Sequence, residues 1–269
     1  MIRVEMLAVG KELLIGRTLN TNAGWIGGRM YAMGGMIDRI LTVTDSLDEI
    51  SSGLTQLLSR RPDFIIVVGG LGPTPDDMTL KGIAMGLGLD LKTNQTAIKL
   101  IKEHLEAVGR RPDLSPQHRK MARLPVGATP LPNEAGTAPG VRIKAGKTVV
   151  FCLPGVPTEM KYIFRRSVEG EIKKKMGVIH TSRVTLKVRG IHEAPLAPAI
   201  ATALKMHPSY IKSHPRSVRE GAPTLELDIV VTSRDRDYAR KAQAELLSFL
   251  SGKIEGLGGE ITSRRETNT

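Results

Sequence analysis

Short apolar runs alternate with amphipathic stretches along roughly the first 150 residues of the chain. The apolar runs are rich in Val and Ile, which is typical of strands covered on both faces, and they occupy residues 2–9, 36–43, 63–68 and 147–153. Apolar residues recur with helical spacing at residues 20–35, 46–61, 79–88, 96–109 and 157–175. The alternation predicts an α/β domain over residues 1–176, built on a doubly wound and mostly parallel sheet.

The pattern changes after residue 177. Alternating strand-like stretches at residues 182–190, 209–214 and 224–233 are interleaved with helical stretches at residues 193–206 and 235–254. This order predicts a small α+β domain of the β-α-β-β-α type over residues 177–257. Residues 258–269 are polar, and we expect them to form a frayed tail.

Composition places the chain among globular proteins. Hydrophobic residues make up 41% of its 269 residues, which gives enough core for a large domain with a smaller companion. The single cysteine, Cys152, excludes an intramolecular disulfide, fits a reducing compartment and is interpreted as a core residue. The chain begins without the features of a signal peptide, and no apolar run reaches membrane-spanning length. We therefore expect a cytoplasmic protein with no membrane partner.

The formal net charge of +12 has two readings. It is either a solvated basic surface or an attraction for phosphorylated partners. Ten Lys or Arg stand against three Glu between Glu171 and Glu220, so much of the excess lies there. Tyr210 is the only aromatic residue of that stretch, which leaves RNA bases little to stack on. We expect no specific nucleic-acid partner.

The stretch "VVGGLGPTPDDMTLKG" joins a predicted strand to a predicted helix. Its glycine-rich turn, with Gly69, Gly70 and Gly72 followed by Thr74, offers backbone N–H groups of the kind that bind phosphate. It matches neither the Walker A loop nor the dinucleotide-binding glycine motif, because no Gly-Lys-Ser/Thr follows and the third glycine of the latter is replaced by proline.

Two adjacent carboxylates, Asp76 and Asp77, follow this turn. One of them could be the N-cap of the next helix. Two exceed what a single cap needs, because like charges about 4 Å apart repel by roughly 4 kcal/mol at an effective dielectric of about 20. A divalent cation between the carboxylates and a phosphate removes that repulsion. We therefore predict that Asp76 and Asp77 hold a metal.

Further candidates lie where a doubly wound sheet binds its ligands, at the carboxyl ends of the strands. Asn20 is equally consistent with a plain helix N-cap, and Asp45 with a residue that only precedes the cap at Ser46. The loop of residues 133–140 could wrap a ligand or be a simple turn. The candidates are Glu12, Asn20, Asn22, Asp45, Asn133, Gly136, Thr137, Gly155 and Glu159.

Four motifs in this order resemble the N-terminal region of the CinA family, whose large domain belongs to the MoaB/Mog molybdopterin-binding superfamily. They are "VGKELLIGRTLNTNA", "GGLGPTPDDMT", "LPNEAGTAPG" and "LPGVPTEM". The resemblance covers nearly the whole chain and implies an α/β domain that binds a nucleotide or pterin phosphate, with metal-dependent ADP-ribose pyrophosphatase activity. It also implies that Asp45 and Asp77 stand at the two functional acidic positions of the superfamily. Full-length members carry a further C-terminal domain with nicotinamide mononucleotide deamidase activity. This chain ends before such a domain, so we expect no deamidase activity.

The leading hypothesis is a hydrolase of a nucleoside diphosphate-sugar such as ADP-ribose, dependent on Mg²⁺, Mn²⁺ or Co²⁺. In it Asp76 and Asp77 hold the metal, and the backbone of Gly70–Thr74 binds a phosphate. Asp45 or Glu159 orients the water. Adenylyl transfer to a pterin, pterin binding, and non-catalytic nucleotide binding remain alternatives. We also expect a homo-oligomer, because the small sheet has free edges and relatives in the superfamily are oligomeric.

Overall fold

The computed structural model describes residues 2–219 and 222–268. The chain divides into two compact units, Met1–Gly177 and Val178–Thr269. The boundary expected between residues 176 and 177 lies one residue before this division. Each unit has its own apolar core.

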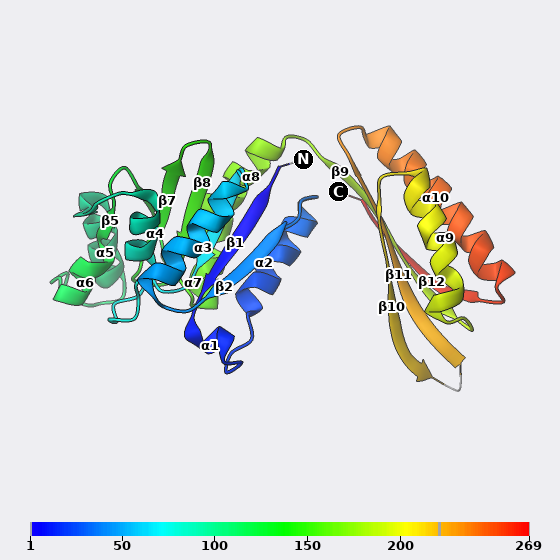
Figure 1. Cartoon of the computed structure of the whole chain (residues 1–269), viewed down its shortest axis with the longest axis horizontal. Helices are drawn as coiled ribbons and strands as arrows, with labels where there is room; N and C mark the ends of the chain where they lie inside the picture. The colour runs from blue at the N-terminus through cyan, green and yellow to red at the C-terminus, as the bar shows by residue number, and fades with distance from the viewer. Residues whose placement is uncertain (1, 220–221, 269) are drawn as a thin grey trace. The chain divides into compact units, whose positions relative to one another are not determined.

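The large unit is built on a six-stranded sheet with the order β2-β1-β3-β8-β7-β6 (Figure 1). Neighbours among β2, β1, β3 and β8 run parallel, whereas β7 is antiparallel to both β8 and β6. The predicted doubly wound and mostly parallel sheet is thereby confirmed. The strands are β1 (Val4–Val9), β2 (Arg39–Val43), β3 (Phe64–Val68), β6 (Thr129–Leu131), β7 (Gly140–Ala145) and β8 (Thr148–Leu153).

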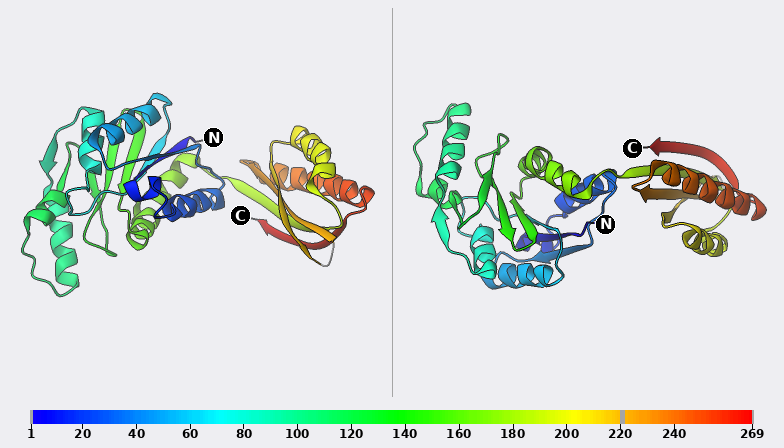
Figure 2. Two further views of the ribbon diagram at one scale, coloured as in Figure 1. Left: turned by 60° about the horizontal axis from the view of Figure 1, so that its bottom comes forward. Right: turned by 90° about the horizontal axis from the view of Figure 1, so that it is seen from above.

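Helices cover both faces of this sheet (Figure 2). Successive residues of a strand face opposite sides, so Leu7 and Val67 join one core while Met6 and Ile66 are fully buried on the other side. The helices are α1 (Lys11–Leu14), α2 (Thr21–Ala32), α3 (Leu47–Ser59), α4 (Thr79–Leu87), α5 (Gln95–Ala107), α6 (Pro116–Met121), α7 (Pro157–Ile163), the π-helical turn η1 (Phe164–Val168) and α8 (Glu169–Met176). A small separate sheet pairs β4 (Leu91–Thr93) with β5 (Arg123–Pro125).

Cys152 lies within β8 and is completely buried. Burial raises the pKa of its thiol to about 12, so the group stays protonated and unreactive at neutral pH. Its interpretation as a core residue agrees with this position.

A bidentate ion pair links α2 to α8. The guanidinium of Arg29 donates to both carboxylate oxygens of Glu169, with Nε 2.7 Å and Nη2 2.8 Å from them. The Lys173 ammonium lies 2.6 Å from the same carboxylate. The side chain of Glu169 is only 8% exposed, so its charge depends on these partners. The hydrogen bonds from Arg29 hold the pKa of Glu169 below its ordinary value.

Replacing Arg29 with Ala should lower the free energy of unfolding at neutral pH. We expect a loss of about 1–2 kcal/mol, less than for a fully buried pair, because Lys173 remains and water reaches Arg29. Because folding lowers the pKa of Glu169, its ionised form contributes to the stability of the fold at pH values above the ordinary carboxyl pKa. That contribution is lost as the pH falls through the lowered pKa of the folded state. Urea titrations should therefore converge for the variant and the wild type in acid. An exposed helix position, Lys102→Ala, serves as control, and equal losses for the two variants would contradict the assignment.

The small unit is a four-stranded antiparallel sheet with the order β10-β11-β9-β12. Both helices lie on one face of it (Figure 1), as a split β-α-β arrangement requires. Its elements are β9 (His180–Arg189), α9 (Glu193–Met206), β10 (Tyr210–Arg219), β11 (Ala222–Ser233), α10 (Arg236–Gly256) and β12 (Glu260–Asn268). The predicted β-α-β-β-α order agrees with the first five.

The expectation of a frayed tail over residues 258–269 was wrong. Strand β12 pairs antiparallel with β9, from Glu260 opposite Arg189 to Asn268 opposite Ser182. Backbone hydrogen bonding to β9 fixes this edge strand, and residues 262–267 are all exposed. Because little side-chain burial is involved, the apolar alternation on which sequence reasoning relies is missing.

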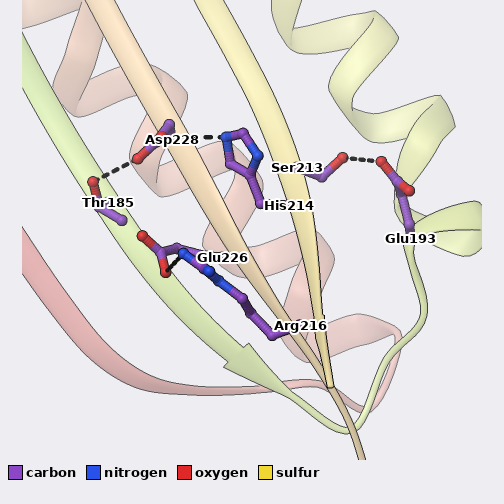
Figure 3. Close-up of polar contacts among 7 residues, drawn as sticks. All are labelled: Thr185, Glu193, Ser213, His214, Arg216, Glu226 and Asp228. Carbon is purple, nitrogen blue, oxygen red and sulfur yellow. Dashed lines mark hydrogen bonds and ion pairs between the residues drawn. The ribbon is translucent and has the colours of Figure 1, made fainter. Parts of the chain in front are cut away.

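The sheet face opposite the two helices carries paired charges (Figure 3). Thr185 donates to Asp228 Oδ1 over 2.6 Å, and His214 Nε2 lies 3.5 Å from Asp228 Oδ2. Nearby, Arg216 Nη2 lies 2.9 Å from Glu226 Oε2. The carboxylates of β11 thus offset part of the positive charge contributed by the neighbouring strand. This internal pairing fits the expectation of no specific nucleic-acid partner, which stays a prediction.

In the part of the chain that the structure describes, no helix has both the length and the apolar content needed to cross a membrane.

Candidate functional site

Three loops meet at the carboxyl edge of the large sheet, directly after β1, β3 and β8. The N–H of Gly69 donates to the carbonyl of Leu153 over 3.0 Å. Gly69 has a φ of 109°, and a Cβ there would lie 2.1 Å from the carbonyl oxygen of Val9. On its other side, a Cβ on Gly155 would be 3.5 Å from the Cα of Gly69. The three loops can therefore approach this closely only because residue 69 is glycine.

The glycine-rich turn leaves several backbone donors available. Thr79 closes the turn, since its hydroxyl donates to the carbonyl of Gly69 over 2.8 Å and its N–H to that of Gly70 over 3.1 Å. The N–H groups of Gly70, Leu71 and Gly72 donate to no group in the described parts of the chain. All three residues line a hollow at this edge. They are the donors that could bind a phosphate.

Asp76 and Asp77 do not cap the following helix. Helix α4 begins at Thr79, and its N-cap residue, Met78, makes no side-chain capping bond. Asp77 Oδ2 instead accepts from the N–H of Thr74 over 2.8 Å and lies 2.6 Å from its hydroxyl oxygen. Asp76 Oδ1 lies 2.5 Å from that same hydroxyl oxygen. The N-cap alternative is thus wrong, because the turn ends two residues before the helix starts.

The two aspartates converge on one hydroxyl that has a single proton to donate. The hydrogen bond from Thr74 lowers the pKa of Asp76, and the nearby charge of Lys120 acts in the same direction. Asp76 is therefore ionised throughout the neutral range. Two negative oxygens held this close to one hydroxyl make an arrangement that a cation would relieve.

The donor set suits a hard divalent cation that keeps most of its coordination open. Among residues 2–219 and 222–268, no cluster of three or more His, Cys, Asp or Glu side chains is arranged to hold a metal ion. Asp76 and Asp77 would thus supply only carboxylate oxygens, and substrate phosphate and water would supply the rest. Mg²⁺ is commonly bound in this way, and the residues present fit such an ion.

A hollow of about 260 Å³ lies beside these aspartates. It brings together four of the predicted carboxylates, because the loops after β1, β2 and β3 end side by side. Those carboxylates belong to Glu12, Asp45, Asp76 and Asp77. Asp45 is held in place by the N–H of Lys11, which donates to its Oδ2 over 2.8 Å.

The two predicted asparagines of the α2 N-terminus also line this smaller hollow. Asn20 is the helix N-cap, because its Oδ1 accepts from the N–H of Ala23 over 3.0 Å. The amide nitrogen of Asn22 donates to the carbonyl of Gly155 over 2.7 Å, which ties α2 to the loop after β8. Its Oδ1 is buried without a partner among the described residues and is free to accept from a ligand.

A larger hollow, of about 610 Å³, adjoins the first. Three residues, Gly70, Asp77 and Gly155, line both hollows. Thr137 and Glu159 are the other predicted residues that the larger hollow includes, together with Gly72. Much of the remaining wall is apolar, and it consists of Leu71, Pro73, Met121, Ala138, Pro154 and Val156.

Glu159 is held at the larger hollow by residues expected to touch substrate. The amide nitrogen of Asn133 lies 2.6 Å from Glu159 Oε2 and also donates to the carbonyl of Ala138 over 2.8 Å. A Cβ on Gly136 would lie 2.2 Å from the Glu159 carboxyl carbon, so only glycine leaves room for that group. Burial raises the pKa of Glu159, although the bond from Asn133 acts the other way.

Three of the predicted substrate-binding residues line neither hollow, namely Thr74, Asn133 and Gly136. Asn133 is only 7% exposed, and its polar atoms are used within the protein. The hydroxyl and the N–H of Thr74 are both directed to the aspartates. Thr74 and Asn133 thus position carboxylates, and Gly136 leaves room for the carboxyl group of Glu159. Their role in substrate binding stays a prediction, because a motif shows which residues are near a site but not which way they point.

Sequence reasoning missed the basic residues of this site. Lys120 on α6 donates to the carbonyls of Thr74 and Gly72, which fixes the aspartate turn from outside. Arg110 and His118 line the larger hollow. They lie more than 30 residues beyond the glycine-rich turn, in a stretch with no motif of its own. Lys120 and His118 reach the site because α6 packs there, whereas Arg110 belongs to the segment between α5 and α6.

Residues 5–174 match the family model described as a probable molybdopterin binding domain. The chain belongs to this family. The match includes all of the six-stranded sheet except Val4 at the start of β1, and it includes both hollows, so the candidate site lies entirely within the family domain.

Relatives extend the similarity over nearly the full chain. A protein of Pyrobaculum arsenaticum is 39% identical over 263 residues, which cover 96% of this chain and 97% of the relative. Protein PAE0875 of Pyrobaculum aerophilum is 38% identical over 253 residues, covering 92% and 94% respectively. Among solved structures, the protein CinA of unknown function from Thermoplasma acidophilum is 39% identical, with a TM-score of 0.58. That match covers 63% of this chain and 98% of the other. The predicted CinA-family resemblance is confirmed.

Proposed function

We propose that the large unit is a metal-dependent hydrolase of a nucleoside diphosphate linked to a second group, such as ADP-ribose. The observation that carries this proposal is the pair of adjoining hollows with a shared wall at Gly70, Asp77 and Gly155. A substrate with two halves joined by a diphosphate would put one half in each hollow. Its diphosphate would then lie against that wall, beside the unpaired N–H groups and the two aspartates.

Each residue then has a defined task. The N–H groups of Gly70, Leu71 and Gly72 bind phosphate oxygens. A divalent cation held by Asp76 and Asp77, with phosphate and water completing its coordination, would neutralise charge on the diphosphate and activate water. Asp45 lines the smaller hollow and Glu159 the larger one, so each faces one side of the diphosphate.

The hydrolysis balances with water as the sole co-reactant. The water oxygen bonds to one phosphorus, the bridging P–O bond breaks, and the second phosphate leaves with the bridging oxygen. We assign the proton released by water to Glu159. Its raised pKa makes it a better proton acceptor than an exposed carboxylate, and the amide of Asn133 keeps it in place.

Pterin chemistry is a second candidate, favoured by the family to which the chain belongs. In it the same groups would bind a nucleotide and a pterin phosphate in the two hollows, and a pterin phosphate would replace water as the acceptor. The mostly apolar wall of the larger hollow suits a flat heterocycle of either kind. The two candidates therefore differ in the acceptor and not in the binding groups.

A turnover screen separates these candidates. The protein would be incubated with ADP-ribose and related nucleoside diphosphate compounds, each with Mg²⁺, Mn²⁺, Co²⁺ or EDTA, and the products identified by mass spectrometry. We expect AMP and ribose 5-phosphate from ADP-ribose with metal and neither with EDTA. Turnover only when a pterin phosphate is added would favour adenylyl transfer. Binding by calorimetry without any product would favour a nucleotide-binding protein.

A further inference from the structure

A third hollow, of about 1050 Å³, lies in the large unit at the opposite edge of the sheet from the candidate site. It is lined around Asp63, just before β3 begins, whereas the candidate site follows the other end of that strand. Five residues of strand separate the two ends by about 16 Å. The two sites are therefore distinct, and the inference below does not depend on the proposed function.

Basic side chains dominate the charged part of this wall. Arg61, Lys144, Lys147 and Lys175 face a single acid, Asp63. That acid is already engaged, because its Oδ2 accepts from the N–H of Arg3 over 2.9 Å and its Oδ1 lies 3.4 Å from the Lys175 ammonium. The side chains of Arg61, Lys144 and Lys147 make no hydrogen bond or ion pair with any residue that the structure describes. Three positive charges thus remain available to an anion.

Arg61 is held in an unusual backbone conformation. Its φ is 55°, and it is the only non-glycine residue with a positive φ in the described ranges 2–219 and 222–268. It follows the C-cap of α3, a place where glycine adopts this conformation at lowest cost. An arginine therefore occupies a place where glycine would adopt the same backbone conformation at lower cost.

Apolar side chains form the other part of the wall. Leu58, Leu87 and Leu89 line the hollow and are each half-buried. Helices α3 and α4 both end here, and their carbonyl ends attract cations. That attraction does not account for Lys144, which lies near the end of β7, or for Lys147, which lies in the turn between β7 and β8. Apolar surface beside three unpaired cations suits a ligand with a flat ring and several phosphates.

We propose that this basic hollow, defined by Arg61, Lys144, Lys147 and the three leucines, is a second binding site for a nucleoside polyphosphate. The phosphates contact the three cations, and the base lies against the leucines. The site lies away from Asp76, Asp77 and Glu159, so it binds the nucleotide without access to the candidate catalytic groups.

Photolabelling with 8-azido-ATP, followed by peptide mapping, tests this proposal because it reports each site separately. We expect labelled peptides that contain Leu58, Leu87 or Leu89. The double variant Lys144→Gln/Lys147→Gln should lower this labelling at subsaturating probe by about tenfold, equivalent to about 1.4 kcal/mol of binding free energy. Both lysines are exposed, Lys144 on β7 and Lys147 in the turn that follows, so the fold should persist, and circular dichroism checks this.

A matched variant, Lys92→Gln/Lys102→Gln, removes the same charge from two exposed positions outside every hollow described above. It should leave the labelling unchanged. Unlabelled ATP should compete at least about tenfold better than tripolyphosphate, because the base contributes apolar contacts. The proposal is overturned by label confined to the glycine-rich turn, by equal losses in the two double variants, or by equal competition from tripolyphosphate.

Discussion

Asp77→Asn should abolish metal-dependent turnover while leaving the fold intact. Asparagine keeps the shape of the side chain, and its amide oxygen can still accept from the N–H and hydroxyl of Thr74, which lie 2.8 and 2.6 Å from the present carboxylate oxygen. What it removes is one negative charge at the wall shared by both hollows. In the proposed hydrolase Asp77 is a direct metal ligand, and its loss should lower kcat/KM at least about 100-fold, since outer-shell changes alone cost roughly 10- to 100-fold.

Two measurements are needed on this variant. Steady-state kinetics on ADP-ribose with saturating metal give the loss of activity, and thermal unfolding gives the stability. Asp90→Asn is the matched control, because Asp90 is exposed and lines neither hollow of the candidate site. If Asp77→Asn loses stability but retains turnover per folded molecule, Asp77 has a structural role only. Wild-type protein without turnover on any diphosphate would instead refute the hydrolase itself.

The architecture of the large unit could be predicted because burial on both faces leaves a direct trace in the sequence. Strand β3 is entirely buried, and its sequence Phe-Ile-Ile-Val-Val has little other physical explanation. Strand β12 has no such trace. Its residues Thr262–Thr267 are exposed, and backbone bonds to β9 hold it in place. A polar edge strand and a polar tail look the same to any argument based on side-chain burial.

The candidate site was predictable to the extent that its chemistry is local in sequence. Asp76 and Asp77 stand beside the glycines that they accompany in space, so charge repulsion alone suggested a cation. The direction of each side chain was not predictable. Asn133 carries the polar groups of a ligand-binding residue, yet its amide is used on Glu159 and Ala138. Lys120 reaches the turn only through tertiary packing, which no local pattern records.

Gly69→Ala should cause the largest loss of stability of any single change considered for this protein. The new methyl group would lie 2.1 Å from the carbonyl oxygen of Val9. Because that oxygen belongs to the backbone and not to a flexible side chain, the backbone itself would have to move. Alanine would also have to adopt a φ of 109°. Together the collision and the backbone strain should cost about 3 kcal/mol or more.

Gly155→Ala tests the same junction from its other side. Its methyl group would lie 3.5 Å from the Cα of Gly69, an ordinary van der Waals contact, and the residue does not have a positive φ. We expect a change below about 1 kcal/mol, measured by urea unfolding under the same conditions. The two substitutions add the same methyl group to facing loops. The difference between their losses of unfolding free energy therefore measures the effect of the close approach of Gly69 to β1. Similar losses for the two variants would mean that loss of glycine, and not this contact, determines stability. If both variants kept the stability of the wild type, the loops after β1 and β3 would not pack against each other. The two hollows would then not share the wall formed by these loops.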